Sequence, residues 1–203
     1  MNKLPKNAFY LSTKPSADED DEDSNDIETV DNSIYFYSSV TKKSILNLNK
    51  QLRSISKELI FVQNHFELSD PPDIKLYINS PGGSLLDCFA TVDVIRNSKA
   101  PIHSIVEGSA ASAGTIISVV APKRSITKNS FMLIHQLSSG MWGKFEDMKD
   151  DMQNNNLFME KIYEIYGQYT KIPKNTLKDI LKRDIYFDAK TCLKYGLVDK
   201  IIE

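Results

Sequence analysis

The chain has 203 residues, 41% of them hydrophobic, and its 25 Lys and Arg against 27 Asp and Glu leave a formal net charge of −2. This size suits one globular domain with a full apolar core, and excludes a small module that needs disulfides or metals for stability. No apolar run reaches the roughly 20 residues of a membrane span, and no apolar segment follows the N-terminal lysines, so we expect a cytoplasmic protein without a membrane partner.

The first 32 residues differ in composition from the rest of the chain. Nine acidic residues and no Lys or Arg stand between positions 17 and 31. Such a run cannot bury enough apolar surface to order itself, so we expect a mobile acidic arm over residues 1–32 and a single domain over residues 33–203. A solvated tail without a specific role and a docking or gating arm fit this composition equally well.

Strands and helices alternate along the predicted domain. The patterns of apolar residues, caps and turns predict, in chain order, strands over 33–37, 74–78, 102–106, 125–127 and 131–134 and helices from 42 to about 62, from 84 to 95 and from about 114 to 120. Glycine-rich turns lead from the second and third strands into the helices that follow them. This alternation is typical of an α/β fold with largely parallel strands.

The C-terminal third is predicted to be mostly helical. Apolar and aromatic residues fall close to helical spacing from Phe145 to Tyr169, which is longer than most globular helices. Such a helix would overhang its own core, which indicates that another subunit covers it, although a core-facing stripe is the simpler explanation. A short helix after Pro173, a helix capped by Asp188 and ended by Gly196, and a closing strand at 197–198 complete the chain.

Ser112 is the residue that most strongly indicates chemistry. It lies where the strand 102–106, after a break at Gly108, gives way to small residues and then to an apolar helix. Unpaired amides at a helix start favour negative charge, and small neighbours allow a substrate carbonyl to approach. A packing turn with an ordinary helix-capping serine is the alternative interpretation of this segment alone.

Three further residue types complete a set that could cleave an amide bond. His135 ends the apolar strand at 131–134, where a side chain can project as a general base. Gly82 and Gly83 follow a strand directly, so their amides could face an oxyanion, although the same sequence also forms plain turns. Asp184 and Asp188 are both candidates for an orienting carboxylate. Since helix capping accounts for Asp188, Asp184 is the better candidate, although it could equally form a surface salt bridge.

The remaining candidates have simpler explanations. Cys88 and Cys192 lie far apart without the paired spacing of a zinc or redox site, so we expect reduced packing residues. His65 and His103 lack a catalytic setting, and the three histidines form no cluster with ligand spacing. We therefore expect no metal, no cofactor and no nucleic-acid partner.

The chain contains, in this order, the segments YINSPGGS at 77–84, EGSAASAG at 107–114, MLIHQ at 132–136 and the stretch from Arg183 to Asp199. These four segments resemble the ClpP family of caseinolytic serine peptidases. The resemblance covers roughly residues 33–203. It implies Ser112 as nucleophile, His135 as base, Asp184 as orienting acid, and the amides of Gly83 and Ala113 as the oxyanion hole. The implied fold is the superhelix of β-β-α units shared with crotonases, with a protruding handle helix.

The resemblance also implies an assembly. Family members form two stacked seven-membered rings that enclose the active sites, interlock through long helices and receive unfolded proteins from an AAA+ unfoldase. By this analogy, Arg183 helps to couple ring contact to the orientation of Asp184. The chain departs from the family where Leu137 replaces the usual proline after His-Gln, and where the acidic arm replaces the usual N-terminal segment.

The sequence analysis thus favours a serine endopeptidase that forms the proteolytic subunit of a self-compartmentalising ring protease and degrades peptides and unfolded proteins. Two alternatives remain. One is a catalytically silent ring subunit that pairs with an active paralogue, and the other is an acyl-CoA enzyme of the related crotonase fold, which also holds an oxyanion with backbone amides.

Overall fold

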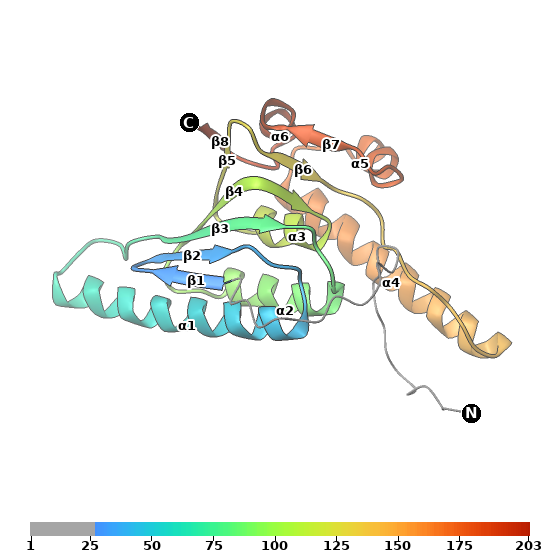
Figure 1. Cartoon of the computed structure of the whole chain (residues 1–203), viewed down its shortest axis with the longest axis horizontal. Coiled ribbons are helices and arrows are strands. Elements are labelled where there is room, and N and C mark those ends of the chain that lie inside the picture. Colours follow the sequence, from blue (N-terminus) through green and yellow to red (C-terminus); the bar gives the residue numbers. More distant parts are fainter. Residues whose placement is uncertain (1–26) are drawn as a thin grey trace.

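The computed structural model of the chain describes residues 27–203, which form one eight-stranded sheet and six helices (Figure 1). The strands are β1 (Ile27–Val30), β2 (Ser33–Phe36), β3 (Ile74–Ser80), β4 (Ile102–Ala111), β5 (Lys123–Thr127), β6 (Phe131–Leu133), β7 (Tyr186–Asp188) and β8 (Lys200–Ile202). The helices are α1 (Lys42–His65), α2 (Leu85–Arg96), α3 (Ala113–Val119), α4 (Phe145–Tyr169), α5 (Lys174–Leu181) and α6 (Ala189–Tyr195). The predicted α/β fold class is confirmed.

The sheet is parallel in its centre and antiparallel at two places. Its main order is β1-β2-β3-β4-β5-β8, and β6 pairs with the C-terminal part of β4 and with β7. Only the β1-β2 and β6-β7 pairs are antiparallel among the described strands. Neighbouring parallel strands need crossover connections, and α1, α2 and α3 supply these connections between β2, β3, β4 and β5. Helix α2 packs against both α1 and α3.

The core lies between the sheet and these helices. Alternate residues of β2 and β3, such as Ile34, Leu76 and Ile78, are fully buried, because strand side chains point to opposite faces in turn. Helix α1 presents a stripe of buried residues at steps of three and four, as its sequence predicts. Thr41 caps α1 and Gly196 ends α6 in the left-handed conformation, which confirms both predicted helix boundaries.

The N-terminal boundary of the folded unit lies earlier than the sequence suggested. Residues 27–30, which we assigned to the acidic arm, form β1 and pair with β2 in the register Ile27 to Phe36. Ile27 is buried, and this apolar contact gives the strand a place in the core. The rest of the predicted arm, residues 1–26, lies outside the described residues.

Two predicted strands differ from the observed ones by more than two residues. Strand β4 does not stop before Gly108 but continues to Ala111, since Ser109 to Ala111 pair with β6 while Gly108 takes a positive φ of 72° and the register against β3 shifts. The closing strand is not Leu197–Val198, which are buried loop residues, but β8 beside β5. In both cases pairing with a distant strand, which local sequence does not encode, decides the outcome.

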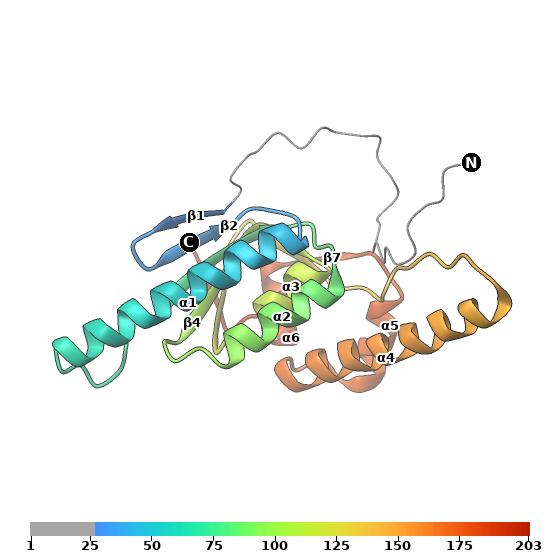
Figure 2. The same ribbon diagram turned by 90° about the horizontal axis from the view of Figure 1, so that it is seen from below.

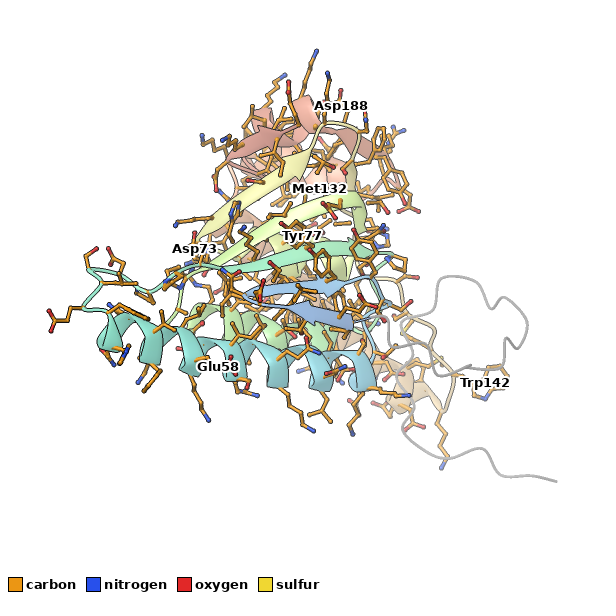
Figure 3. All side chains as sticks on the ribbon, turned by 60° about the vertical axis from the view of Figure 1, so that its left-hand side comes forward. Glu58, Asp73, Tyr77, Met132, Trp142 and Asp188 are labelled. Atoms are coloured by element: carbon orange, nitrogen blue, oxygen red, sulfur yellow. The ribbon has the colours of Figure 1, made fainter. Side chains whose placement is uncertain are left out.

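Helix α4 extends away from the sheet, as its length predicts (Figures 1 and 2). Its buried residues, Ile162, Ile165 and Tyr166, all lie in its C-terminal half. The other half exposes large apolar side chains, namely Phe145, Met148, Met152 and Leu157. Just before the helix, Trp142 projects with 98% of its surface exposed (Figure 3). Among residues 27–203, no helix combines the length and the apolar character needed to cross a bilayer.

Arg124 joins the C-terminal elements to the sheet. Its side chain is only 14% exposed and donates to both carboxylate oxygens of Asp199, to the Gly196 carbonyl at 3.0 Å and to the Tyr169 carbonyl. A planar guanidinium can serve all these acceptors at once, whereas an ammonium cannot.

We therefore expect Arg124→Lys to lower the free energy of unfolding by about 1–3 kcal/mol, measured by urea denaturation. The adjacent Lys123 provides the control, because it pairs with Asp73 at 2.6 Å but is 57% exposed. Lys123→Ala should cost about 1 kcal/mol or less. Equal losses for the two variants would contradict the structural role assigned to Arg124.

Candidate active site

One cavity of about 680 Å³ is lined by all five residues that the resemblance implied, Gly83, Ser112, Ala113, His135 and Asp184. They come from the turn after β3, the junction between β4 and α3, the segment after β6 and the segment after α5. The sheet order explains this convergence. Strands β3 and β6 both pair with β4, so the C-terminal ends of three parallel strands meet at one edge.

Ser112 occupies a strained backbone conformation at the start of α3. Its φ is 54° and its ψ is −123°, a combination that a residue with a side chain rarely adopts. Ser112 N–H donates to the Leu133 carbonyl at 2.9 Å, which ties the junction to β6. The hydroxyl makes no capping bond to the helix, so the interpretation of Ser112 as an ordinary cap does not hold. A strained residue whose hydroxyl is free to face a cavity is a functional candidate.

The Gly82-Gly83 turn packs directly against Ser112. A Cβ on Gly82 would lie 2.6 Å from Ser112 Cβ and 2.7 Å from the Ala111 carbonyl oxygen, and a Cβ on Gly83 would lie 2.3 Å from the Val40 carbonyl oxygen. Both glycines have positive φ, of 93° and 142°. Val40 holds the turn from the other side, because its N–H donates to Gly82 O and its carbonyl accepts from Ser84 N–H, each at 2.8 Å. Only glycine fits at these two positions.

Two backbone amides at this contact remain available to a ligand. Within residues 27–203, neither the Gly83 N–H nor the Ala113 N–H donates to a backbone carbonyl. Ala113 is the first residue of α3, where an amide has no partner within the helix. Both residues line the cavity beside Ser112. The pair can therefore serve as donors to an oxygen bound next to the Ser112 hydroxyl.

His135 and Asp184 lie in direct contact with each other. His135 Nδ1 lies 3.0 Å from Asp184 Oδ1, and the imidazole is 17% exposed. The Gln136 N–H donates to the Leu181 carbonyl at 2.7 Å, which fixes the segment after β6 to the end of α5 and so to the residues before Asp184. With its proton on Nδ1, which faces this carboxylate, a neutral imidazole would have Nε2 as its proton acceptor. No hydrogen bond joins the Ser112 hydroxyl to His135 among the described residues.

The two candidate acids have different surroundings. Asp188 accepts from the Thr191 N–H at 2.8 Å at the start of α6, and the hydrogen bonds from Thr191 hold the pKa of Asp188 below its ordinary value. This confirms the predicted cap. Asp184 instead contacts His135, although its side chain is 77% exposed in the single chain.

The other sequence candidates lie outside the chemistry. Cys88 and Cys192 are buried, unpaired thiols, and burial raises the pKa of Cys192 to about 12 and that of Cys88 further, so neither is a ready nucleophile. His103 Nε2 bonds to Ser125 Oγ at 2.8 Å within the sheet, and His65 stacks on Phe61 at the end of α1. Among residues 27–203, no three His, Cys, Asp or Glu side chains are grouped as a metal site would need.

The structure adds cavity residues that sequence reasoning missed. Ile116 of α3 and Ile162 and Tyr166 of α4 line the same cavity as Ser112, and Val40 supports the glycine turn. The three helix residues appear in the sequence only as members of apolar stripes. No local signal distinguishes them from other core residues, because their position depends on how α4 crosses α3.

Comparison with known proteins agrees with this geometry. The sequence profile of the Clp protease family matches residues 28–203. The chain belongs to the Clp protease family. It is 30% identical over 171 residues to the ATP-dependent Clp protease proteolytic subunit of Deinococcus radiodurans, which covers 82% of this chain and 84% of the relative. It is 31% identical over 171 residues to the ATP-dependent Clp protease proteolytic subunit 1 of Prochlorococcus marinus, covering 82% and 88%.

Membership of the Clp protease family confirms the resemblance and makes the chain a member of a family of serine peptidases. It disfavours the alternative of a crotonase-type acyl-CoA enzyme. Identities near 30% are also compatible with the other alternative, a catalytically silent member of the family.

The strain at Ser112 can be measured apart from activity. Glycine adopts positive φ without the cost that a Cβ imposes, whereas alanine retains that cost. We expect Ser112→Gly to exceed Ser112→Ala in free energy of unfolding by about 1 kcal/mol, determined by urea denaturation under identical conditions. If Ser112→Ala is as stable as Ser112→Gly, the backbone at this position carries no strain.

Proposed function

We propose that this chain is a serine endopeptidase, the proteolytic subunit of a self-compartmentalising ring protease that degrades peptides and unfolded proteins. The observation that carries the proposal is the strained Ser112, its hydroxyl free of capping, in one cavity with the contacting His135–Asp184 pair and two available amides. Hydrolysis of an amide needs each of these parts.

In the proposed mechanism, the Ser112 oxygen attacks the carbonyl carbon of the scissile bond while His135 Nε2 takes its proton. Asp184 keeps the imidazole in the required tautomer and stabilises the positive charge that forms on it. The amides of Gly83 and Ala113 donate to the oxyanion of the tetrahedral intermediate. His135 then protonates the leaving amine, and a water molecule, activated in the same way, releases the acyl group from Ser112.

The proposed assembly follows from surfaces that a single chain leaves uncovered. The exposed apolar side chains of α4 and the neighbouring Trp142 form a surface suited to burial against another subunit. Asp184 is 77% exposed in the single chain, whereas the orienting acids of triads are normally enclosed. A subunit contact that excludes water would strengthen its electrostatic interaction with His135. By analogy with the family, the chains assemble into two stacked seven-membered rings, and an AAA+ unfoldase supplies unfolded proteins to them. Arg183 then couples contact between the rings to the orientation of Asp184.

A fluorophosphonate probe tests the nucleophile. The parent protein should be labelled once and should cleave a short fluorogenic peptide, while Ser112→Ala and His135→Ala should lower kcat by about 10⁴-fold or more. Labelling that survives Ser112→Ala would contradict the assignment. An assembled protein that is neither labelled nor active would instead identify a silent ring subunit.

Two neighbouring carboxylates provide the matched control for this experiment. Asp184→Asn should reduce kcat strongly because it removes the acceptor that fixes the His135 tautomer. Asp188→Asn should leave kcat near that of the parent, since asparagine caps a helix as well as aspartate does.

Native mass spectrometry tests the assembly. The parent should give an oligomer of about fourteen chains, whereas Met148→Gln combined with Met152→Gln should shift the population toward smaller species, because polar groups replace the apolar contact surface. Peptide cleavage per chain should fall together with the large species. A parent that is monomeric and fully active would contradict the proposed ring.

A further inference from the structure

Two buried hydroxyl groups form a hydrogen-bonded chain directly beneath Ser112. The Thr115 hydroxyl, on α3, donates to the Ser112 carbonyl oxygen at 2.6 Å, and the Tyr166 hydroxyl, on α4, lies 2.5 Å from the Thr115 oxygen. Thr115 is fully buried and Tyr166 is 1% exposed. The bond between Thr115 and Tyr166 connects residues 51 positions apart in the sequence.

The direction of each bond follows from the number of protons. A carbonyl oxygen cannot donate, so Thr115 uses its single hydroxyl proton on the Ser112 carbonyl. Tyr166 must then be the donor to Thr115. Burial raises the pKa of Tyr166 above its ordinary value, so its hydroxyl keeps the proton that this arrangement needs.

The Ser112 carbonyl belongs to the peptide unit that also carries the Ala113 N–H. A peptide unit is planar, and in its trans form the N–H points away from the C=O. Anchoring the carbonyl oxygen therefore fixes the direction in which the Ala113 N–H points. Besides Thr115 Oγ1, the carbonyl accepts from the Thr115 N–H at 3.0 Å and from the Ile116 N–H at a longer 3.4 Å.

This peptide unit needs anchoring because Ser112 lies in an unfavourable conformation. A backbone with φ of 54° and ψ of −123° persists only where the surroundings hold it. A helical threonine often bonds to a carbonyl of the preceding turn, so the Thr115 bond alone would be unremarkable. Its connection to a buried tyrosine of α4 is different, since Tyr166 restricts the Thr115 hydroxyl to one acceptor.

We propose that Thr115 and Tyr166 are positioning residues that aim the Ala113 N–H at the oxyanion by holding the Ser112–Ala113 peptide plane. The inference rests on the proposed function, in which the Ala113 N–H is an oxyanion donor. It gives α4 a second role besides subunit contact, because the helix supplies the outer hydroxyl of the chain. Neither residue touches the reacting atoms.

The test uses single and double variants of the assembled full-length protein. Tyr166→Phe and Thr115→Val each remove one hydroxyl and keep most of the side-chain volume, and Thr115→Ser retains the hydroxyl. Tyr163→Phe is the matched control, because Tyr163 lies one turn earlier on α4 and is only partly buried. The readouts are kcat and KM for a short peptide and the second-order rate of fluorophosphonate labelling, with assembly checked by native mass spectrometry.

We expect Tyr166→Phe and Thr115→Val to lower both kcat and the labelling rate by about tenfold or more with little change in KM, since the loss falls on the oxyanion. The kcat and the labelling rate of the double variant should be no lower than those of Thr115→Val alone, because the Tyr166 hydroxyl acts only through the Thr115 hydroxyl. Thr115→Ser and Tyr163→Phe should stay within about twofold of the parent.

Three results would overturn the inference. The first is a kcat and a labelling rate equal to those of the parent in assembled Tyr166→Phe and Thr115→Val; with a labelled parent, this result overturns the inference alone. The second is a double variant whose fold-loss in kcat is the product of the two single fold-losses. The third is a parent protein that is not labelled at all, which overturns the proposed function and this inference with it.

If Thr115→Val does not assemble, Thr115→Ala takes its place under the same criteria.

Discussion

The close approach of two chain segments is the constraint on which the rest of the structure depends. The Gly82-Gly83 turn is so tightly enclosed that neither glycine has room for a Cβ, because Gly82 lies against the backbone at residues 111–113 and Gly83 lies against Val40. This contact exists because β3 and β4 are parallel neighbours whose C-terminal ends both lead into helices. It places two amides without backbone partners beside one strained serine, and the β6 and α5 segments then add His135 and Asp184. Without this contact, the cavity would lack the two available amides beside the serine.

Much of this arrangement could be predicted from the sequence, because the decisive signals are local. Glycines directly after an apolar strand, a serine where a strand gives way to a helix, and a histidine at the end of a buried strand each mark the carboxyl edge of a parallel sheet. The caps at Thr41 and Asp188 and the stop at Gly196 are equally local, and the structure confirms all three. The overhang of α4 followed from length alone, since a helix of this length exceeds the core of one domain.

Pairings between distant segments could not be predicted. Strand β4 runs on to Ala111 because β6 offers it a partner, β8 forms at residues 200–202 because β5 does, and β1 forms inside the predicted arm because it pairs with β2. The bond between Thr115 and Tyr166 belongs to the same class, since its partners are ordinary core residues until α4 crosses α3. Strain at Ser112 is likewise a tertiary property, because local sequence does not force a serine to a positive φ.

The structure of the fluorophosphonate adduct of the assembled protein tests the central claim most directly, since the phosphonyl group resembles the tetrahedral intermediate. We expect phosphorus bonded to Ser112 Oγ, with the non-bridging phosphonyl oxygen about 2.7–3.1 Å from the amide nitrogens of both Gly83 and Ala113. An adduct on another residue, or an oxygen that points away from both amides, would contradict the claim.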